Sequence, residues 1–533
     1  MNVVLSYDPI GWGVPFAGKL VSDLPAQQAD VASQLLVILL DVGKPPLPVI
    51  TNFPDAPGPG GDPNTGVREE APQPGQEGYN LYRNMLNALM HPDDMRFVVD
   101  GIIRLLNSGH ESKQTVIPGS REPFDTQEAI LVLLWKLIEE NLTFTSYLLE
   151  HSDINQLVVP LCYLLLVHRK DPTRSGLMHI NTFILLKLSG ERNFGVSLNK
   201  PCTVKLPVDV PLFTGTHADL LVVTLHKLVV SGSDRLSSLY HCFLTVIANV
   251  SPYCKSLSLV ASVKMVNLFE LFTSPQFLYS AQANHTYVLL LVESFNNVIQ
   301  YQYTGNPHLT YAIVRRRKLF ESLSNLTLEA AIAAAKQEAG SGIKSVPPAS
   351  EPSPMATREI CRGAGGAEED VIEEASPVRP PPTVQRQSRA TEGEQAGAAA
   401  NEVITVGRLP DDALCKVIPP FLPNEEWLAL VKPEAALNTI LRLIGHLAPQ
   451  LDHACKMGKV TNEAQVLDFI TNTTMVGLLP VPHPIIIRRY QPNYYTKLWF
   501  SSFLWGVVFV KNQGVNPLFD GEAVRLFTVT TQP

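Results

Sequence analysis

The chain has 533 residues, of which 45% are hydrophobic and 17% are charged, and its formal net charge is −8. This apolar content is enough to bury a large core. The acidic balance argues against a nucleic-acid partner, because proteins that bind polyanions normally carry a strong basic excess.

The seven cysteines are scattered and form no C-x-x-C pair, so they predict neither a disulfide framework nor a zinc site. The first residues, "MNVVLSYDPIGWG", lack the basic and apolar regions of a secretory signal. The longest apolar runs, such as residues 157–167, are shorter than the roughly 18 residues that a membrane-spanning helix needs. We therefore expect a chain without a transmembrane helix that works in a reducing compartment.

Two stretches of unusual composition divide the chain. Residues 44–78 are rich in Pro, Gly and Asp, and residues 337–405 are rich in Ala, Gly, Glu, Pro and Ser. Neither stretch can bury enough apolar surface to offset its ordering entropy, so we predict a disordered loop and a disordered linker. An N-terminal helical segment over 1–43, a helical-repeat body over 79–336 and a C-terminal helical block over 406–533 remain.

Helical periodicity dominates these remaining parts. The run "DTQEAILVLLWKLIEENL" begins with Asp125 three residues before Glu128, in capping-box spacing, and continues with an apolar stripe. Similar runs predict helices over residues 154–168, 176–188, 217–231, 235–249, 254–273 and 285–302. Helix pairs recur at roughly 35 to 45 residues, as in HEAT and armadillo units. The predicted fold is all-α: an irregular HEAT/armadillo-like α-solenoid with long disordered insertions.

The polar stretch "GERNFG" is the first candidate site. A catalytic role would need a second acid, a nucleophile or a histidine, and no neighbouring residue supplies one. The simpler interpretation is that Gly190 ends the preceding helix in a left-handed C-cap and that the charged residues hold the turn. We favour an interaction or structural loop made of Gly190, Glu191, Arg192, Asn193, Phe194 and Gly195.

The stretch "FTGTHADLL" places His217 and Asp219 near a predicted helix start, which is compatible with an acid/base pair. Capping by Thr216 or Asp219 is the simpler explanation. The sequence also lacks a P-loop, an H-E-x-x-H motif and a G-x-S-x-G motif. We expect no catalytic residues, no small-molecule substrate and no enzymatic activity.

A metal site is conceivable in "HLAPQLDHAC", which contains His446, His453 and Cys455. Pro449 interrupts this run, and no fourth ligand stands close to it. We expect neither a metal nor a cofactor.

Two further stretches are candidates for membrane or partner contact. The basic cluster at residues 315–318 ends a helical block, where cations interact favourably with the helix dipole or could touch anionic lipid. Residues 477–510 are rich in proline and aromatic side chains, for which core packing is favoured over an exposed binding surface. The candidates for membrane or partner contact are Arg315, Arg316, Arg317, Trp499 and Trp505.

Several stretches together identify a family resemblance. They are "YDPIGWGVP", "GLMHINTFILLKLSGERNFGVSLNKP", "VPLFTGTHADLLVV", "ANVSPYCKSLSL", "FNNVIQYQYTGN", "YAIVRRRKLF" and "VGLLPVPHPIIIRRYQ". In this order they resemble the Hid/dymeclin family, which includes the high-temperature-induced dauer formation (Hid) proteins. The resemblance covers the chain except for the two low-complexity stretches. The family has no assigned catalytic residues to carry over to "GERNFG".

The resemblance implies a non-enzymatic, cytosol-facing protein of the Golgi and trans-Golgi network that supports sorting of cargo into secretory granules or dense-core vesicles. It also implies protein partners at the Golgi. Hid proteins carry a further helical region and a Met-Gly myristoylation signal upstream, whereas this sequence begins "MNVVLSYDP". We therefore expect a truncated or alternatively started form whose peripheral membrane association is indirect. An α-solenoid adaptor in another transport process and a lipid- or protein-modifying enzyme are the alternatives.

Overall fold

The computed structural model describes residues 1–9, 24–41, 79–114, 124, 127–211, 213–340, 421–432, 434–458, 460–475, 477–482 and 484–513. The predicted loop at 44–78, Asp125 and nearly all of the predicted linker lie outside these residues. Throughout the described ranges the regular structure is helical and no strand forms, apart from one isolated bridge between Pro201 and Thr216. The predicted all-α class is confirmed.

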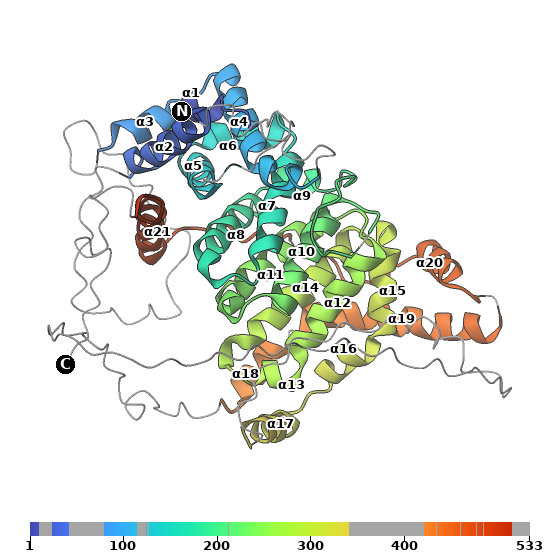
Figure 1. The fold of residues 1–533 in the computed structure, drawn as a ribbon. Coiled ribbons are helices and arrows are strands. Elements are labelled where there is room, and N and C mark those ends of the chain that lie inside the picture. The colour runs from blue at the N-terminus through green and yellow to red at the C-terminus, as the bar shows by residue number, and fades with distance from the viewer. Residues whose placement is uncertain are drawn as a thin grey trace, which may run out of the picture.

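Most helices belong to two rows that lie side by side (Figure 1). The first row contains α1 (Asn2–Leu5), α4 (Pro92–Glu111), α7 (Asn155–His168), α10 (His217–Ser231), α12 (Leu259–Thr273), α15 (Pro307–Arg315) and α20 (Glu463–Asn472). The second row contains α2 (Leu24–Leu39), α5 (Gln127–Glu140), α8 (Ser175–Ser189), α11 (Tyr240–Val250), α14 (His285–Tyr301) and α19 (Glu434–Lys456).

Each helix packs on the next helix of its own row, and each helix from α1 to α15 in the first row also packs on its counterpart in the second. This repeated stacking of helix pairs is the solenoid arrangement that the sequence predicts. The other α-helices are α3 (Leu81–Asn87), α6 (Leu142–Glu150), α9 (Arg192–Ser197), α13 (Pro275–Leu278), α16 (Arg317–Ser324), α17 (Leu328–Gly340), α18 (Glu425–Val431) and α21 (Tyr494–Asn512). Short 3-10 turns cover Pro172–Arg174, Asp234–Leu239, Ser251–Tyr253, Gln282–Asn284 and Tyr303–Gly305.

Two helix starts and one helix end differ from the prediction. The helix predicted over 235–249 begins as a 3-10 turn, and α11 starts only at Tyr240. The helix predicted from residue 254 starts at Leu259, because the hydroxyl of Ser258 accepts the N–H of Ala261 and caps it there. Helix α17 continues to Gly340 and so extends into the predicted linker.

The prediction that Pro449 interrupts its run was wrong, because α19 continues through this residue. A proline inside a helix removes one backbone hydrogen bond and crowds the preceding turn. Leu447, Ala448 and Leu451 on the same turns are buried, and α19 packs on α14, α15 and α16. Burial of this apolar face compensates for the missing bond.

Helix α5 is buried on all sides, although its sequence predicts a single apolar face. Its residues from Glu128 to Ile138 are all buried. The helix packs on α2, α4 and α8, and α21 covers a further side of it (Figure 1). The second apolar face is therefore buried by a helix from the other end of the chain.

The C-terminal part of the chain returns along the second row. Residues 484–512, which we call the return segment, contact Glu293 on α14, Asn249 on α11, Phe183 on α8 and Trp135 on α5. Beyond α2, the carboxylate of Asp41 accepts hydrogen bonds from Ser501 (2.6 Å) and from the indole N–H of Trp505 (3.1 Å). The return segment thus runs along the second row from α14 to the residue that follows α2.

Buried asparagines link neighbouring helices. Asn306 is fully buried and its carbonyl oxygen accepts the backbone N–H of Leu257 at 2.9 Å. Its amide group donates to the carbonyls of Cys254 (2.9 Å), Lys255 (3.2 Å) and Gln302 (2.8 Å). One side chain therefore satisfies backbone groups at the C-terminal end of α14 and in the connection that leads into α12.

We expect Asn306→Ala to lower the free energy of unfolding by about 2–4 kcal/mol, because it leaves several buried backbone groups without their partner. Chemical denaturation followed by circular dichroism measures this change. Asn325→Ala is the matched control, since the Asn325 side chain is exposed. Equal stability of the two variants would contradict the assigned role of Asn306.

Candidate functional site

In the candidate loop "GERNFG", only Gly190 and Glu191 connect α8 to α9, and the other four residues form the first part of α9. Glu191 is extended and serves as the N-cap residue of α9, which starts at Arg192. Phe194 is fully buried, and α9 packs on α6, α8 and α11. Arg192 and Asn193 are exposed on the first turn. The buried face anchors the short helix and leaves its polar face in solvent.

Gly190 does not adopt the predicted left-handed conformation, since its φ of −68° and ψ of −7° are right-handed helical values. A side chain here would be close to one backbone atom and in ordinary contact with the return segment. A Cβ atom at Gly190 would lie 3.2 Å from the carbonyl oxygen of Lys187 and 3.4 Å from Cγ of Arg489 in the return segment. At Gly195, a Cβ atom would lie 2.6 Å from the ring of Tyr253.

Asn199 fixes the chain that follows α9. Its amide group donates to the carbonyls of Val196 (3.0 Å) and Tyr253 (2.8 Å), and its carbonyl oxygen accepts the N–H of Lys255 (2.8 Å). From the other side, the amide of Asn155 donates to the carbonyl of Ser197 at 3.0 Å. These bonds tie α9 to the start of α7 and to the connection after α11.

The next residues are bound to the start of α10. The carbonyl of Lys200 accepts the N–H of His217 at 3.1 Å and lies 2.8 Å from Nδ1 of the same residue. Thr216 and Asp219 form a capping box, which confirms the capping interpretation of this histidine-containing stretch. The second oxygen of the buried Asp219 carboxylate accepts the N–H of Ser258 at 2.7 Å.

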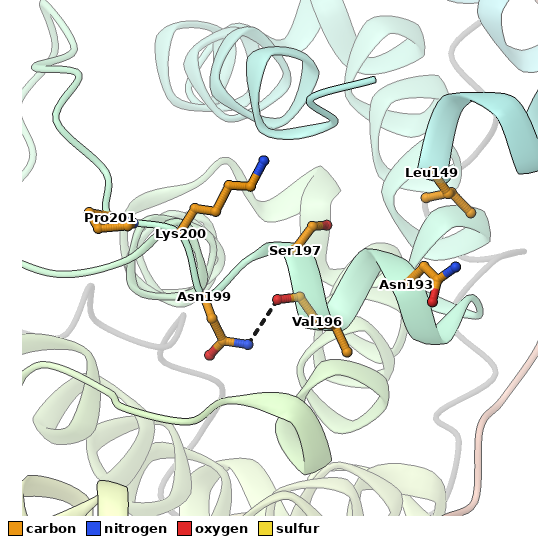
Figure 2. Close-up of a pocket in the computed structure, with 7 residues that line it drawn as sticks. All are labelled: Leu149, Asn193, Val196, Ser197, Asn199, Lys200 and Pro201. Carbon is orange, nitrogen blue, oxygen red and sulfur yellow. Dashed lines mark hydrogen bonds between the residues drawn. The ribbon is translucent and has the colours of Figure 1, made fainter. Parts of the chain in front are cut away.

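A shallow depression of about 570 Å³ opens beside α9 (Figure 2). Its lining residues are Leu149, Asn193, Val196, Ser197, Asn199, Lys200 and Pro201. Figure 2 shows them spread from Leu149 and Asn193 at one end to Lys200 and Pro201 at the other. The depression therefore lies along α9 and the residues that follow it, and Asn193 is the residue of the candidate loop that lines it.

The ionisable groups near this depression are engaged with one another. The ammonium of Lys200 lies 3.0 Å from the carboxylate of Asp153. Partial burial raises the pKa of Asp153, but the hydrogen bond and charge of Lys200 outweigh this and hold the pKa below its usual value. Burial raises the pKa of the Cys254 thiol to about 12, so this thiol is protonated at neutral pH. This chemistry suits an anchored protein-contact surface better than proton transfer.

The basic cluster lies at the junction of α15 and α16. The guanidinium of Arg316 is 3.1 Å from the carboxylate of Glu270, and that of Arg317 is 3.4 Å from Asp452. Arg315 is the exposed last residue of α15. Arg316 and Arg317 therefore pair with acids on neighbouring helices.

The two predicted tryptophans lie on α21. Trp499 stacks on Phe503 with ring centroids 5.3 Å apart and meets Phe183 edge-to-face at 5.5 Å. Trp505 is 38% exposed, and its indole N–H donates to Asp41. Trp499 is partly buried against α8, which agrees with the favoured core interpretation, whereas Trp505 is exposed and does not. None of the helices in the described ranges is long and apolar enough to cross a membrane.

The residues considered as metal ligands, His446, His453 and Cys455, lie on α19. The ring of His446 is 3.1 Å from the amide of Gln450, and His453 is exposed. In the described part of the chain, no group of three or more His, Cys, Asp or Glu side chains could hold a metal ion.

Sequence reasoning missed the polar side chains that organise this region. Asn199 and Asn249 bind backbone groups of distant segments, and Arg488 binds Glu293. The signal for Asn249 was present, because an amide in the apolar run "FLTVIANV" must find hydrogen-bond partners when it is buried. Its partners are not local, so the run alone does not name them.

We expect Phe194→Ala to lower the free energy of unfolding by about 3–5 kcal/mol, because the side chain is fully buried. Arg192→Ala should change it by less than about 0.5 kcal/mol, since this side chain is exposed. Chemical denaturation of both variants tests the loop as a structural anchor. Equal effects of the two substitutions would show that the burial of Phe194 does not hold α9 in place.

Comparisons with known proteins agree with the motif order. A family model described as "Dymeclin: Dyggve-Melchior-Clausen syndrome protein" matches residues 1–507. Protein HID1 from Mus musculus is 38% identical over 550 residues, which cover 99% of this chain and 68% of the mouse protein. Protein HID1 from Dictyostelium discoideum is 28% identical over 578 residues, covering 99% of this chain and 63% of that protein.

A more distant relative is the Ubp5-interacting protein ftp105 from Schizosaccharomyces pombe, which is 27% identical over 263 residues, or 48% of this chain and 28% of the yeast protein. None of these names denotes an enzymatic activity. No solved structure matches the chain. Because the family model spans residues 1–507 and the mouse relative aligns with 99% of the chain, the chain belongs to the Hid/dymeclin family.

Proposed function

We propose that this chain is a non-enzymatic trafficking scaffold of the Golgi and trans-Golgi network that supports sorting of cargo into secretory granules or dense-core vesicles. The observation that carries the proposal is the alignment with HID1 proteins over 99% of the chain. This alignment supports extending to the chain the Golgi role that the Hid resemblance implies.

The architecture supports a scaffold, because stacked helix pairs present long surfaces on which several proteins can bind. At the candidate loop, the polar groups hold segments of the solenoid together. Asn199 binds the backbone of two other segments, and Lys200 pairs with Asp153. The exposed Asn193, which lines the depression, and its exposed neighbour Arg192 are the side chains that we propose for partner contact.

A solenoid adaptor in another transport process is the second candidate. One relative is named for its interaction with Ubp5, which favours a protein-binding role for the family without favouring the Golgi. The two functions differ in which proteins lie close to the chain in the cell. An enzyme acting on lipid or protein is less well supported, because the ionisable groups at the loop already serve as structural partners.

Proximity labelling in secretory cells tests the proposal. With a biotin ligase fused to the chain, we expect Golgi and trans-Golgi proteins to be enriched over cells that express the ligase alone. Enrichment of nuclear-transport proteins without Golgi proteins would contradict the Golgi proposal and favour an adaptor in another transport process.

We propose further that a protein partner supplies any association with the Golgi membrane. Each Lys or Arg close to an anionic surface contributes about 1 kcal/mol. Arg316 and Arg317 already lie next to Glu270 and Asp452, whose charges oppose attraction to anionic lipid. The net charge of −8 acts in the same direction.

We expect the purified chain to remain in the supernatant when it is sedimented with vesicles of phosphatidylcholine and phosphatidylserine at physiological salt. Neutral phosphatidylcholine vesicles are the control. Sedimentation that persists in an Arg315→Glu, Arg316→Glu, Arg317→Glu variant would reveal a membrane anchor elsewhere, with the surface around Trp499 and Trp505 the first to examine.

A further inference from the structure

The return segment is bound to the second row in the way that a protein groove binds an extended peptide. The carbonyl oxygen of Asn249 accepts the backbone N–H of Arg488 at 2.9 Å, and its amide donates to the backbone carbonyl of Arg488 at 2.9 Å. One side chain can bind both groups of one residue because they point the same way in an extended chain. These bonds recognise backbone, and their geometry does not depend on the bound sequence.

The side chain of Asn249 is fixed in the orientation that binds Arg488. It is fully buried on α11, and its amide also donates to the hydroxyl of Ser189 at the end of α8 at 3.0 Å. Every hydrogen-bonding group of the side chain is therefore directed to a defined partner. Without the return segment, the buried amide of Asn249 would lose two of its hydrogen bonds. Binding of an extended chain at this position is therefore favoured.

The arginine side chain is recognised separately. The two terminal nitrogens of the Arg488 guanidinium donate to the two carboxylate oxygens of Glu293, at 2.6 and 2.7 Å. This bidentate geometry is specific for arginine. The neighbouring Arg489 has a side chain that is 71% exposed and lies 3.8 Å from Glu191. Only one of the two adjacent arginines is bound closely.

Two residues after Arg488, Tyr490 enters an aromatic pocket. Its ring stacks on Phe183 with a centroid distance of 5.4 Å and meets Trp135 edge-to-face at 5.7 Å. Side chains two residues apart share one side of an extended chain. Glu293, Asn249 and the aromatic pair therefore read an Arg-x-Tyr pattern, while the intervening residue points outward.

The preceding part of the chain is held less tightly. Ile485 and Ile486 are 37% and 58% exposed, and Val481 is 86% exposed. Residues 484–493 form no regular secondary structure. The bound portion thus consists of a short peptide-like stretch, residues 488–490, between an exposed connection and α21.

We propose that the surface formed by Glu293, Asn249, Phe183 and Trp135 is a peptide-recognition groove, which residues 488–490 occupy in cis. The partner that fits it is a protein with an extended Arg-x-Tyr segment. This segment takes the place of residues 488–490. The inference goes beyond the proposed function, because the groove can be tested on the purified chain independently of its place in the cell.

The tethered segment competes with any outside peptide. A segment joined by a short linker acts at an effective concentration of about millimolar, and a site occupied in this way shows a reduced apparent affinity. The wild-type chain should therefore bind a free peptide weakly. Weakening the tethered segment, without altering the groove, should strengthen peptide binding.

Fluorescence anisotropy tests this with a labelled peptide of residues 484–493, PIIIRRYQPN. We expect the full chain carrying Arg488→Ala and Tyr490→Ala to bind it at least about tenfold more tightly than the wild type does, because the groove is vacated. Arg489→Ala is the matched control and should bind like the wild type. Adding Glu293→Gln to the double variant should remove the gain.

An unchanged affinity of the double variant would overturn the proposal, and so would a gain that survives Glu293→Gln. The same peptide with alanine at both recognition positions should not bind. A melting curve of each variant identifies a folding defect. If the double variant does not fold, hydrogen exchange of the wild-type chain with millimolar peptide decides: faster exchange of residues 486–490 supports displacement, and unchanged exchange overturns it.

A second copy of the chain could also supply the segment. Sedimentation of the wild-type chain over a range of concentrations tests this. We expect a monomer with the segment bound in cis. A dimer that the labelled peptide does not dissociate would assign the groove to exchange between copies and overturn the assignment to an outside partner.

Discussion

The pairing of Asn249 with both backbone groups of Arg488 anchors the return segment on the second row. It holds the return segment at the middle of the second row. From that point the chain can reach α5 and α2, where Phe500 and Leu504 are buried. Without this path, one apolar face of α5 would be open to water. This amide contact therefore lies on the path that brings α21 to α5.

The molecule uses neutral amides at these crossing points for a physical reason. An ionised side chain that is removed from water loses several kcal/mol unless its pairing is excellent. An amide loses less, and it can donate and accept at once. Asn306 and Asn199 each join two segments in this way. The close pair of Arg488 and Glu293 keeps partial solvent access, with side chains 37% and 22% exposed.

Local sequence signals predicted what depends on local interactions. The apolar spacing of 217–231 and the capping residues at its start correspond to α10 and its capping box. The right-handed conformation of Gly190 and the passage of α19 through Pro449 were not predicted. Gly190 continues the right-handed turn of α8, and apolar packing against distant helices supports the turns around Pro449. Buried asparagines were visible in the sequence, but their partners were not.

The stretch "GLMHINTFILLKLSGERNFG" illustrates how the candidate loop and the groove are connected. At its start, a Cβ atom on Gly176 would collide with the ring of Phe503 in α21. In its middle, Phe183 receives Tyr490, and at its end Gly190 leaves room for Arg489. Helix α8 is thus shaped along its length to fit the return segment. Gly190 also leads directly into α9, so the end of α8 lies between the return segment and the candidate loop, where Glu191 is 3.8 Å from Arg489.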